Sequence, residues 1–202
     1  MLLTGAAARG ACHDALDREH DHTHHETHDD AVDRSCQAAE AAAHSRTLAP
    51  YDRCVNELAD RVSLRELVEA YAHHVDRLDP EAVAALFCDD GVLAIYEGDP
   101  DVIEPARVRT GHRDIADALA GLSRYAVTTH FLGQQSVDLA GDTATGETYC
   151  MAHHITDADG ERRDKVLSIR YLDRFRRVEG RWRIEERRLA IDWSDERVLP
   201  PR

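Results

Sequence analysis

Residues 165–193 read KVLSIRYLDRFRRVEGRWRIEERRLAIDW. Apolar and polar side chains alternate on both sides of Glu179-Gly180, which is the pattern of two strands that each bury one face. Glu179-Gly180 favours a tight turn, because glycine adopts the positive φ angles that such turns need. The stretch therefore predicts an antiparallel hairpin of residues 165–177 and 181–193.

Two further strands are expected directly upstream of this hairpin. Residues 126–139 and 143–156 also show a period of two, and each run ends in a cluster of turn-forming residues, Ala140-Gly141-Asp142 and Asp157-Ala158-Asp159-Gly160. Four long strands joined by short turns predict an antiparallel meander.

Helical spacing replaces alternation closer to the N-terminus. Apolar side chains recur every three to four positions over residues 64–78, and Ser63 and Glu66 have the spacing of a capping box at the start of this helix. Asp79-Pro80 predicts the start of a second helix, because proline fits the first helical turn, and the apolar face of this helix extends to Phe87.

Two more elements complete the expected order. Residues 92–96 predict a short strand, and residues 111–122 a third helix that is closed by glycine and serine. Three helices and a curled antiparallel sheet predict an α+β fold in which the sheet wraps a helix and leaves a pocket.

Residues 1–50 have a different composition from the rest of the chain. They hold seven of the 13 histidines and many acidic residues, but few large apolar ones. Such a segment buries too little surface to offset the entropy of ordering, so we expect a disordered tail over residues 1–50 and one domain over residues 51–202. The His/Asp tract has no scaffold to fix ligand geometry, and no metal site is expected there.

Charge and cysteine usage limit the classes of partner. The chain has a net charge of −14, which disfavours nucleic acid and anionic membrane surfaces as partners. No run of apolar residues approaches the length of a membrane span, and the N-terminus makes a poor signal peptide. The five cysteines form no C-x-x-C pair, which favours reduced thiols and a cytoplasmic location.

Several segments together resemble the SnoaL-like family. YAHHVDRLD at residues 71–79 and the segment 86–91 are similar to the first two helices of that family. Thr129-His130-Phe131 is similar to its histidine-bearing strand, and residues 171–193 to its closing hairpin. The resemblance implies the nuclear transport factor 2-like cone, a cone-shaped α+β barrel in which three N-terminal helices pack in a curved antiparallel sheet that encloses a pocket. Scytalone dehydratase, hexachlorocyclohexane dehydrochlorinase, bile acid 7α-dehydratase and polyketide cyclases share this fold.

The resemblance also implies candidate catalytic residues. In the dehydratase branch a helix aspartate holds a strand histidine that removes a substrate proton, and the matching residues are Asp76 and His130. A neutral imidazole is the natural base near pH 7, and a carboxylate on its far nitrogen fixes the tautomer and stabilises the imidazolium. Tyr71 matches a tyrosine that steadies or protonates a leaving oxygen, and Arg187 matches an arginine that stabilises an enolate or a departing anion.

Structural alternatives remain open for each of these residues. A buried Asp–His pair can be purely structural. Tyr71 lies on the apolar stripe of its helix, where a core tyrosine is expected, and Arg187 stands in the run Glu185-Glu186-Arg187-Arg188, which also fits a solvated strand with cross-strand pairs.

Strand alternation predicts the lining of the pocket. His130 shares a face with Thr128, Leu132 and Gln134, and the family register points Thr148, Cys150, Ala152 and His154 inward. His154 is therefore a second histidine candidate, the alternative being that His153 and His154 are ordinary polar residues of a strand. The predicted substrate-binding residues are Leu132, Cys150, His154, Leu167, Ile169, Tyr171 and Leu189.

The resemblance implies a dehydratase-like lyase or isomerase that needs no cofactor or metal and acts on a small hydrophobic cyclic molecule. Two alternatives remain: a ligand-binding or accessory protein without chemistry, like the small subunits of ring-hydroxylating dioxygenases, and a polyketide cyclase. Members of the family commonly form homo-oligomers, so a dimer or trimer is expected.

Overall fold

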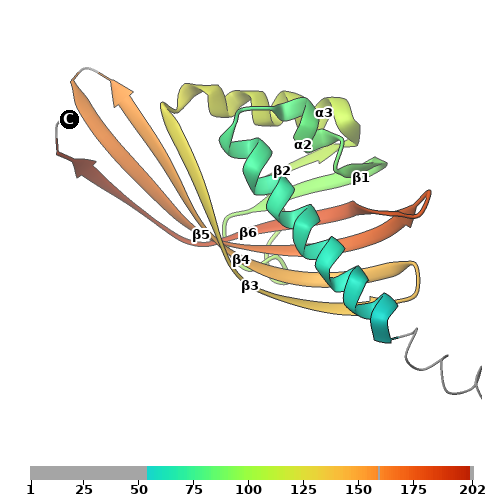
Figure 1. Cartoon of the computed structure of the whole chain (residues 1–202). Coiled ribbons are helices and arrows are strands. Elements are labelled where there is room, and N and C mark those ends of the chain that lie inside the picture. Colours follow the sequence, from blue (N-terminus) through green and yellow to red (C-terminus); the bar gives the residue numbers. More distant parts are fainter. Residues whose placement is uncertain (1–53, 159, 201–202) are drawn as a thin grey trace, which may run out of the picture. The chain divides into compact units, whose positions relative to one another are not determined.

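Six strands form one mixed sheet in the order β2-β1-β6-β5-β4-β3 (Figure 1). The computed structural model describes residues 54–158 and 160–200, so the predicted tail of residues 1–50 lies outside the described residues. The strands are β1 (Phe87–Tyr96), β2 (Arg107–Thr110), β3 (Val127–Ala140), β4 (Thr143–Ala158), β5 (Glu161–Val178) and β6 (Arg181–Leu199).

The predicted meander is confirmed. Strands β3 to β6 pair antiparallel in sequence order, whereas β1 pairs parallel with β6 and antiparallel with β2. The turn between β5 and β6 has positive φ angles at Glu179 (50°) and Gly180 (77°), as expected for a two-residue hairpin. The last two strands are longer than predicted, because residues 161–164 and 194–199 continue the ladder with mostly polar side chains.

The first helix covers residues 54–76 and crosses one face of the sheet (Figure 1). The prediction that it begins at Ser63 is wrong, because Ser63 and Glu66 lie in its middle. Contacts with the sheet hold the earlier turns: Asp60 accepts hydrogen bonds from Trp182 Nε1 (3.0 Å) and Arg177 Nη2 (2.7 Å). Tertiary contacts therefore override the local capping signal.

The second helix is shorter than predicted. Helix α2 (Pro80–Ala84) begins after Asp79, whose carboxylate accepts a hydrogen bond from the backbone N–H of Ala82 (3.1 Å), so the predicted start is confirmed. Phe87 lies in β1 rather than on this helix, and the predicted strand at 92–96 is the second half of β1. Phe87 pairs with Ile184 of β6 and is buried in the core, which draws the chain into the sheet.

Helix α3 (Gly111–Ala120) and the 3₁₀ turn η1 (Gly121–Arg124) occupy the predicted third helical segment. Strands β1 and β2 precede them, so the helices do not all come before the sheet in sequence. The sequence did not predict β2, whose four residues are too few to show a period.

One face of the sheet is covered and the other is open. The covered face packs against the first helix and α3 through a core that includes Leu64, Tyr71, Ile115, Tyr171 and Ile184. On β4 the covered face carries Thr148, Cys150, Ala152 and His154, all of them buried, as predicted. The α+β fold with a curved, unclosed sheet agrees with the predicted fold class.

Candidate active site

The structure brings Asp76 and His130 together on the covered face. Asp76 ends the first helix, and His130 lies 54 residues later on β3. Nδ1 of the His130 ring lies 2.7 Å from Asp76 Oδ1, and the backbone N–H of His130 donates a second hydrogen bond to Oδ2 at 2.9 Å. Both carboxylate oxygens therefore hold one residue, which fixes the imidazole relative to the helix.

The carboxylate of this pair is ionised near neutral pH. Burial raises the pKa of Asp76, but the side-chain and backbone hydrogen bonds from His130 outweigh burial and leave the pKa below its ordinary value. An ionised carboxylate only accepts hydrogen bonds, so Nδ1 of His130 carries the hydrogen of the bond to Asp76 Oδ1. With Nδ1 holding this hydrogen, Nε2 is the ring atom that carries the lone pair of a base in the neutral form of an imidazole. The His130 side chain is only 6% exposed, so little water reaches it.

A second imidazole lies beside this pair. The ring of His154 is 5.6 Å from that of His130, centroid to centroid, and stacks at 4.6 Å on the ring of Tyr125. His154 is buried, and its Nε2 has no hydrogen-bond partner among the described residues. Burial, with the nearby charges of His130, Arg124 and Lys165, lowers the pKa of His154 to about 4, so its ring is neutral near pH 7.

Arg187 is completely buried, so the alternative that it lies on a solvated strand is wrong. Its Nε and Nη2 donate to the two carboxylate oxygens of Asp173, each at 2.8 Å. The guanidinium carbon lies 4.1 Å from the ring centroid of Tyr71 and 4.0 Å from that of Tyr171. Burial lowers the pKa of Arg187, but Asp173 outweighs burial and raises it, so the pair is ionic. One donor, Nη1, has no partner among the described residues.

Tyr71 lies in the hydrophobic core, as its place on the helix predicted. Its side chain packs edge-on against Tyr171 and Phe87. Burial raises the pKa of the Tyr71 phenol, although the Arg187 cation opposes this, so the hydroxyl stays protonated at neutral pH. The hydroxyl can therefore donate a proton or a hydrogen bond.

The other predicted lining residues lie on the covered face. Cys150, Leu167, Ile169 and Tyr171 are buried in the core, and Leu132 and Leu189 pack against it half-buried. The Tyr171 hydroxyl contacts Cys150 Sγ at 3.6 Å. Burial raises the pKa of the Cys150 thiol to about 11, so this sulfur is neutral.

One predicted neighbour of His130 is wrong. Gln134 was expected on its face, but β3 has a bulge between Leu132 and Gln135. The extra residue reverses the alternation, so Gln134 is exposed, while Gln135 is half-buried opposite Thr148. Gly133 at the bulge was the signal, because an isolated glycine within a strand often marks one.

A second Asp–His pair, which the sequence did not predict, lies on the open face. His153 Nδ1 lies 3.0 Å from Asp164 Oδ2, and Arg197 Nη2 donates to the same oxygen at 3.0 Å. His153 lies on β4 and Asp164 on β5, where only the strand register brings them together.

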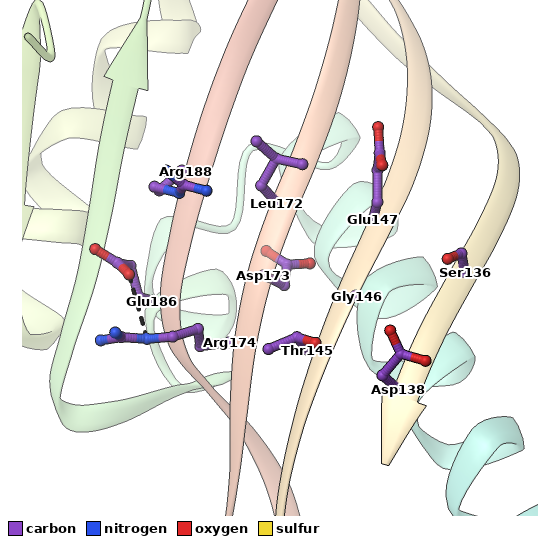
Figure 2. Close-up of a pocket in the computed structure, with 10 residues that line it drawn as sticks. All are labelled: Ser136, Asp138, Thr145, Gly146, Glu147, Leu172, Asp173, Arg174, Glu186 and Arg188. Carbon is purple, nitrogen blue, oxygen red and sulfur yellow. Dashed lines mark ion pairs between the residues drawn. The ribbon is translucent and has the colours of Figure 1, made fainter. Parts of the chain in front are cut away.

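The open face also has a hollow of about 580 Å³, which the sequence did not predict. Figure 2 shows the side chains around it, which project from strands β3 to β6. It is lined by Ser136, Asp138, Thr145, Gly146, Glu147, Leu172, Asp173, Arg174, Glu186 and Arg188.

Two features are absent from residues 54–158 and 160–200. No cluster of three or more His, Cys, Asp or Glu side chains there could hold a metal ion. Within the same residues, no helix combines the length and apolar character needed to cross a membrane.

Comparison with solved structures finds the same fold. A proposed scytalone dehydratase from Novosphingobium aromaticivorans superimposes with a TM-score of 0.61 and 23% identity, covering 72% of this chain and 92% of that protein. The hexachlorocyclohexane dehydrochlorinase LinA-type3 from Novosphingobium barchaimii gives a TM-score of 0.59 and 14% identity, covering 73% of this chain and 99% of that one. At such identities the likeness establishes the fold alone.

A third structure and the family comparison complete these findings. An NTF2-like protein with a cystatin-like fold, also from N. aromaticivorans, has 27% identity and a TM-score of 0.53, covering 68% of this chain and 84% of its own. Among curated proteins, none matches the sequence. The sequence pattern of the SnoaL-like domain matches residues 56–188, which hold Asp76, His130 and the four-stranded meander up to Arg188. The chain therefore belongs to the SnoaL-like family of the NTF2-like superfamily.

Proposed function

We propose that the protein is a lyase or isomerase that removes a proton from a small hydrophobic cyclic substrate without a cofactor. The observation that carries this proposal is the double hydrogen bond from Asp76 to His130, which leaves Nε2 of a nearly buried imidazole as a base. Solved structures of the same fold with dehydratase and dehydrochlorinase names support the same reaction class.

In the proposed reaction His130 Nε2 takes a proton from a substrate carbon. The electron pair of the broken C–H bond forms a double bond as a hydroxyl or another small group leaves the neighbouring carbon with its own bonding pair. Asp76 stabilises the imidazolium that forms, because no cation among the described residues competes for this carboxylate. In the isomerase variant the proton returns to a different carbon.

Tyr71, Arg187 and His154 are assigned supporting roles. The Tyr71 phenol keeps its proton and is proposed to donate it to a leaving oxygen. Nη1 of Arg187 is proposed to hydrogen-bond a substrate oxygen, although Asp173 already compensates most of the charge of this arginine. Nε2 of His154 is the other buried polar atom proposed to bind the substrate or a water molecule. Leu132, Cys150, Leu167, Ile169, Tyr171 and Leu189 supply the apolar wall.

Proton abstraction can be tested before the natural substrate is known. The full-length protein is incubated in D₂O with a panel of cyclic ketones, and NMR follows exchange of the protons next to the carbonyl. We expect exchange that His130→Ala abolishes and that the matched variant His153→Ala retains. Exchange equal in the wild type and in His130→Ala would overturn the assignment of the base.

A binding or accessory protein without chemistry is the competing function. The same hydrogen bonds also pin the first helix to β3, so they are useful without catalysis. This alternative predicts that Asp76→Asn lowers the melting temperature while no ketone of the panel exchanges protons. A polyketide cyclase would instead form a new ring without changing the mass of the molecule. NMR of the product detects such a ring.

A further inference from the structure

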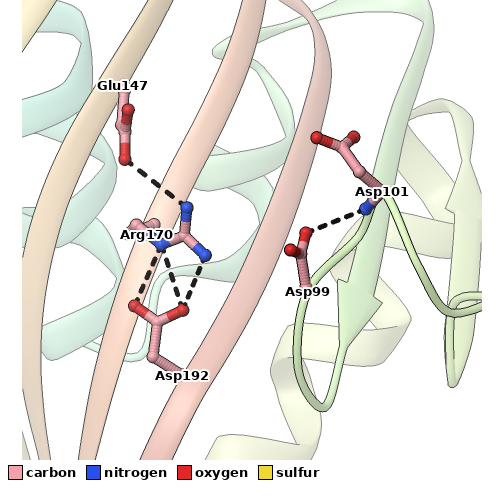
Figure 3. Close-up of polar contacts among 5 residues, drawn as sticks. All are labelled: Asp99, Asp101, Glu147, Arg170 and Asp192. Carbon is pink, nitrogen blue, oxygen red and sulfur yellow. Dashed lines mark hydrogen bonds and ion pairs between the residues drawn. The ribbon is translucent and has the colours of Figure 1, made fainter.

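Lys165 differs from the other cations of its strand in the balance of its charge. Every arginine of β5 forms an ion pair with a carboxylate of this chain: Arg162, Arg163, Arg170, Arg174, Arg176 and Arg177. Figure 3 shows one of these pairs, in which Arg170 donates through two nitrogens to Asp192, with Glu147 3.7 Å away. Lys165, the only lysine in the chain, has no ion-pair partner in residues 54–158 and 160–200.

Lys165 lies on the covered face, beside the buried His154. The two residues are register partners on β5 and β4, so their side chains leave the same face, with Cβ atoms about 5 Å apart. Glu196 lies opposite Lys165 on β6, but Arg163 binds that carboxylate at 3.2 Å. Because the Lys165 side chain is exposed, its ammonium is available to an anion from outside the chain.

A second cation reaches the same imidazole from η1. The ring of Tyr125, which directly follows η1, stacks on His154 at 4.6 Å. The guanidinium carbon of Arg124 lies 4.5 Å from the centroid of the Tyr125 ring. Its nitrogens donate to the Tyr125 hydroxyl at 3.0 Å and to the carbonyl of Gly121 at 2.7 Å. Both acceptors are neutral, so they hold the guanidinium in place while no carboxylate of the described part of the chain balances its charge.

His154 connects the two cations with the candidate base. It is 7% exposed, and its ring lies 5.6 Å from that of His130, centroid to centroid. Burial and His130 lower the pKa of His154 most, and the charges of Arg124 and Lys165 add to the effect, so both cations act on this ring. Its unpartnered Nε2 is a buried polar atom that needs a hydrogen bond, and the cations beside it favour a negatively charged oxygen.

We propose that Arg124, Lys165 and His154 bind the carboxylate of an anionic substrate. The inference rests on the proposed function for the reacting carbon, and it adds that the cyclic substrate is a carboxylic acid. A carboxylate has enough lone pairs to accept hydrogen bonds from a guanidinium, an ammonium and an imidazole together. One imidazole separates the cations from His130, so the substrate needs about one ring between its carboxylate and the carbon that loses a proton.

The acidic character of the whole chain does not oppose such a substrate. Its charge of −14 disfavours large polyanions, which meet many surface carboxylates at once. A small anion at the site meets mainly the charges near it, because salt screens exposed charges beyond about 8 Å at physiological ionic strength. Two cations without acidic partners therefore decide the local preference.

Binding can be tested apart from catalysis with the full-length His130→Ala protein, which lacks the proposed base. Isothermal titration calorimetry compares an oxocyclohexane carboxylate with its primary amide, which has nearly the same shape but no charge. We expect the carboxylate to bind about 10-fold more tightly than the amide, the combined effect of two exposed ion pairs. Arg124→Ala and Lys165→Ala should each reduce this preference by about threefold, and the double variant should abolish it.

Arg181→Ala is the matched control. It removes an exposed arginine that has no ion-pair partner among the described residues, at the opposite end of β6 from Glu196, so the net charge changes equally. This variant should keep the preference for the carboxylate. In the parent protein the preference should shrink as salt is added, because the two cations are exposed. Circular dichroism checks that each variant is folded.

Three results would overturn the proposal: equal affinities for carboxylate and amide, no binding of either compound, or a preference that the double variant retains. The result for the anion site is separate from the result for the reaction. A carboxylate preference that depends on Arg124 and Lys165 supports the site even if the wild type catalyses no D₂O exchange, in which case the proposed reaction alone fails.

Discussion

The two Asp–His pairs of this protein use the same two residue types on opposite faces of one sheet. In the first pair the imidazole of His130 is 6% exposed and the Asp76 side chain 26%. In the second pair the exposures are reversed, with His153 at 34% and Asp164 at 3%. Arg197 shares the carboxylate of Asp164, whereas the two hydrogen bonds described for the carboxylate of Asp76 both come from His130.

This contrast shows what distinguishes a candidate base from a structural ion pair. A carboxylate that serves one imidazole keeps its charge for the imidazolium that forms in a reaction. A carboxylate whose charge an arginine already compensates stabilises an imidazolium less. An imidazole exposed to water also has weaker electrostatic interactions. The pair on the covered face is therefore the candidate for chemistry, and the other pair is its internal control.

The largest expected effect separates the two histidines directly. His130→Ala should lower turnover by about 10² to 10⁴, the usual contribution of a general base. His153→Ala should change turnover by less than about threefold, because surface substitutions away from a site have small effects. Steady-state kinetics, or the D₂O exchange rate, measures both. Equal losses in the two variants would mean that the faces do not differ as described.

A third carboxylate, Asp173, extends the comparison to a fully compensated pair. Arg187→Ala should destabilise the protein by about 3–5 kcal/mol, because it leaves the Asp173 charge buried without a partner. Urea unfolding monitored by circular dichroism gives the value. Arg187→Leu/Asp173→Leu should recover much of the loss, and a double variant as unstable as Arg187→Ala would show that the charge is not the cause.

The two aspartates sharpen the contrast between chemistry and stability. Asp76→Asn should lower turnover by about 10² or more, since it keeps the shape but loses the charge that stabilises the imidazolium. Asp164→Asn should leave turnover unchanged and instead cost about 1–3 kcal/mol of stability, as expected for weakening buried hydrogen bonds to charged groups. Kinetics and urea unfolding of both variants are compared at pH 7. A loss of turnover in Asp164→Asn would remove the distinction.

The smallest expected effect is a pH dependence caused by His154 beside the first pair. The folded protein holds its pKa near 4 against an ordinary value of 6.5, so the unfolded chain binds more protons between these values. The contribution of neutral His154 to the free energy of unfolding should be fully present above about pH 6.5. It should be lost as the pH drops toward 4, by up to roughly 3 kcal/mol. His154→Gln should flatten the unfolding free energy over this window, and His153→Gln should not. A slope that persists in His154→Gln would have another origin.

The pattern of side chains predicted much of the fold because it records which faces are buried. The sequence predicted the meander, the Glu179-Gly180 turn and the start of α2 at Asp79-Pro80, because each depends on the local period or on turn chemistry. The pairing of Asp76 with His130 was reached through the family resemblance and not from local pattern, because 54 residues separate them.

Tertiary structure decided the features that depend on long-range contacts. Asp60 binds Trp182 and Arg177, and this extends the first helix past its capping signal at Ser63. The bulge at Gly133 moves Gln134 off the face of His130, since one extra residue reverses the alternation of a strand. The sequence by itself determined the four long strands, the helical segments and their periods, but not β2. Only the folded chain decided that Arg187 is buried against Asp173, and that one Asp–His pair is enclosed while the other faces water, because burial and charge compensation depend on residues from distant strands.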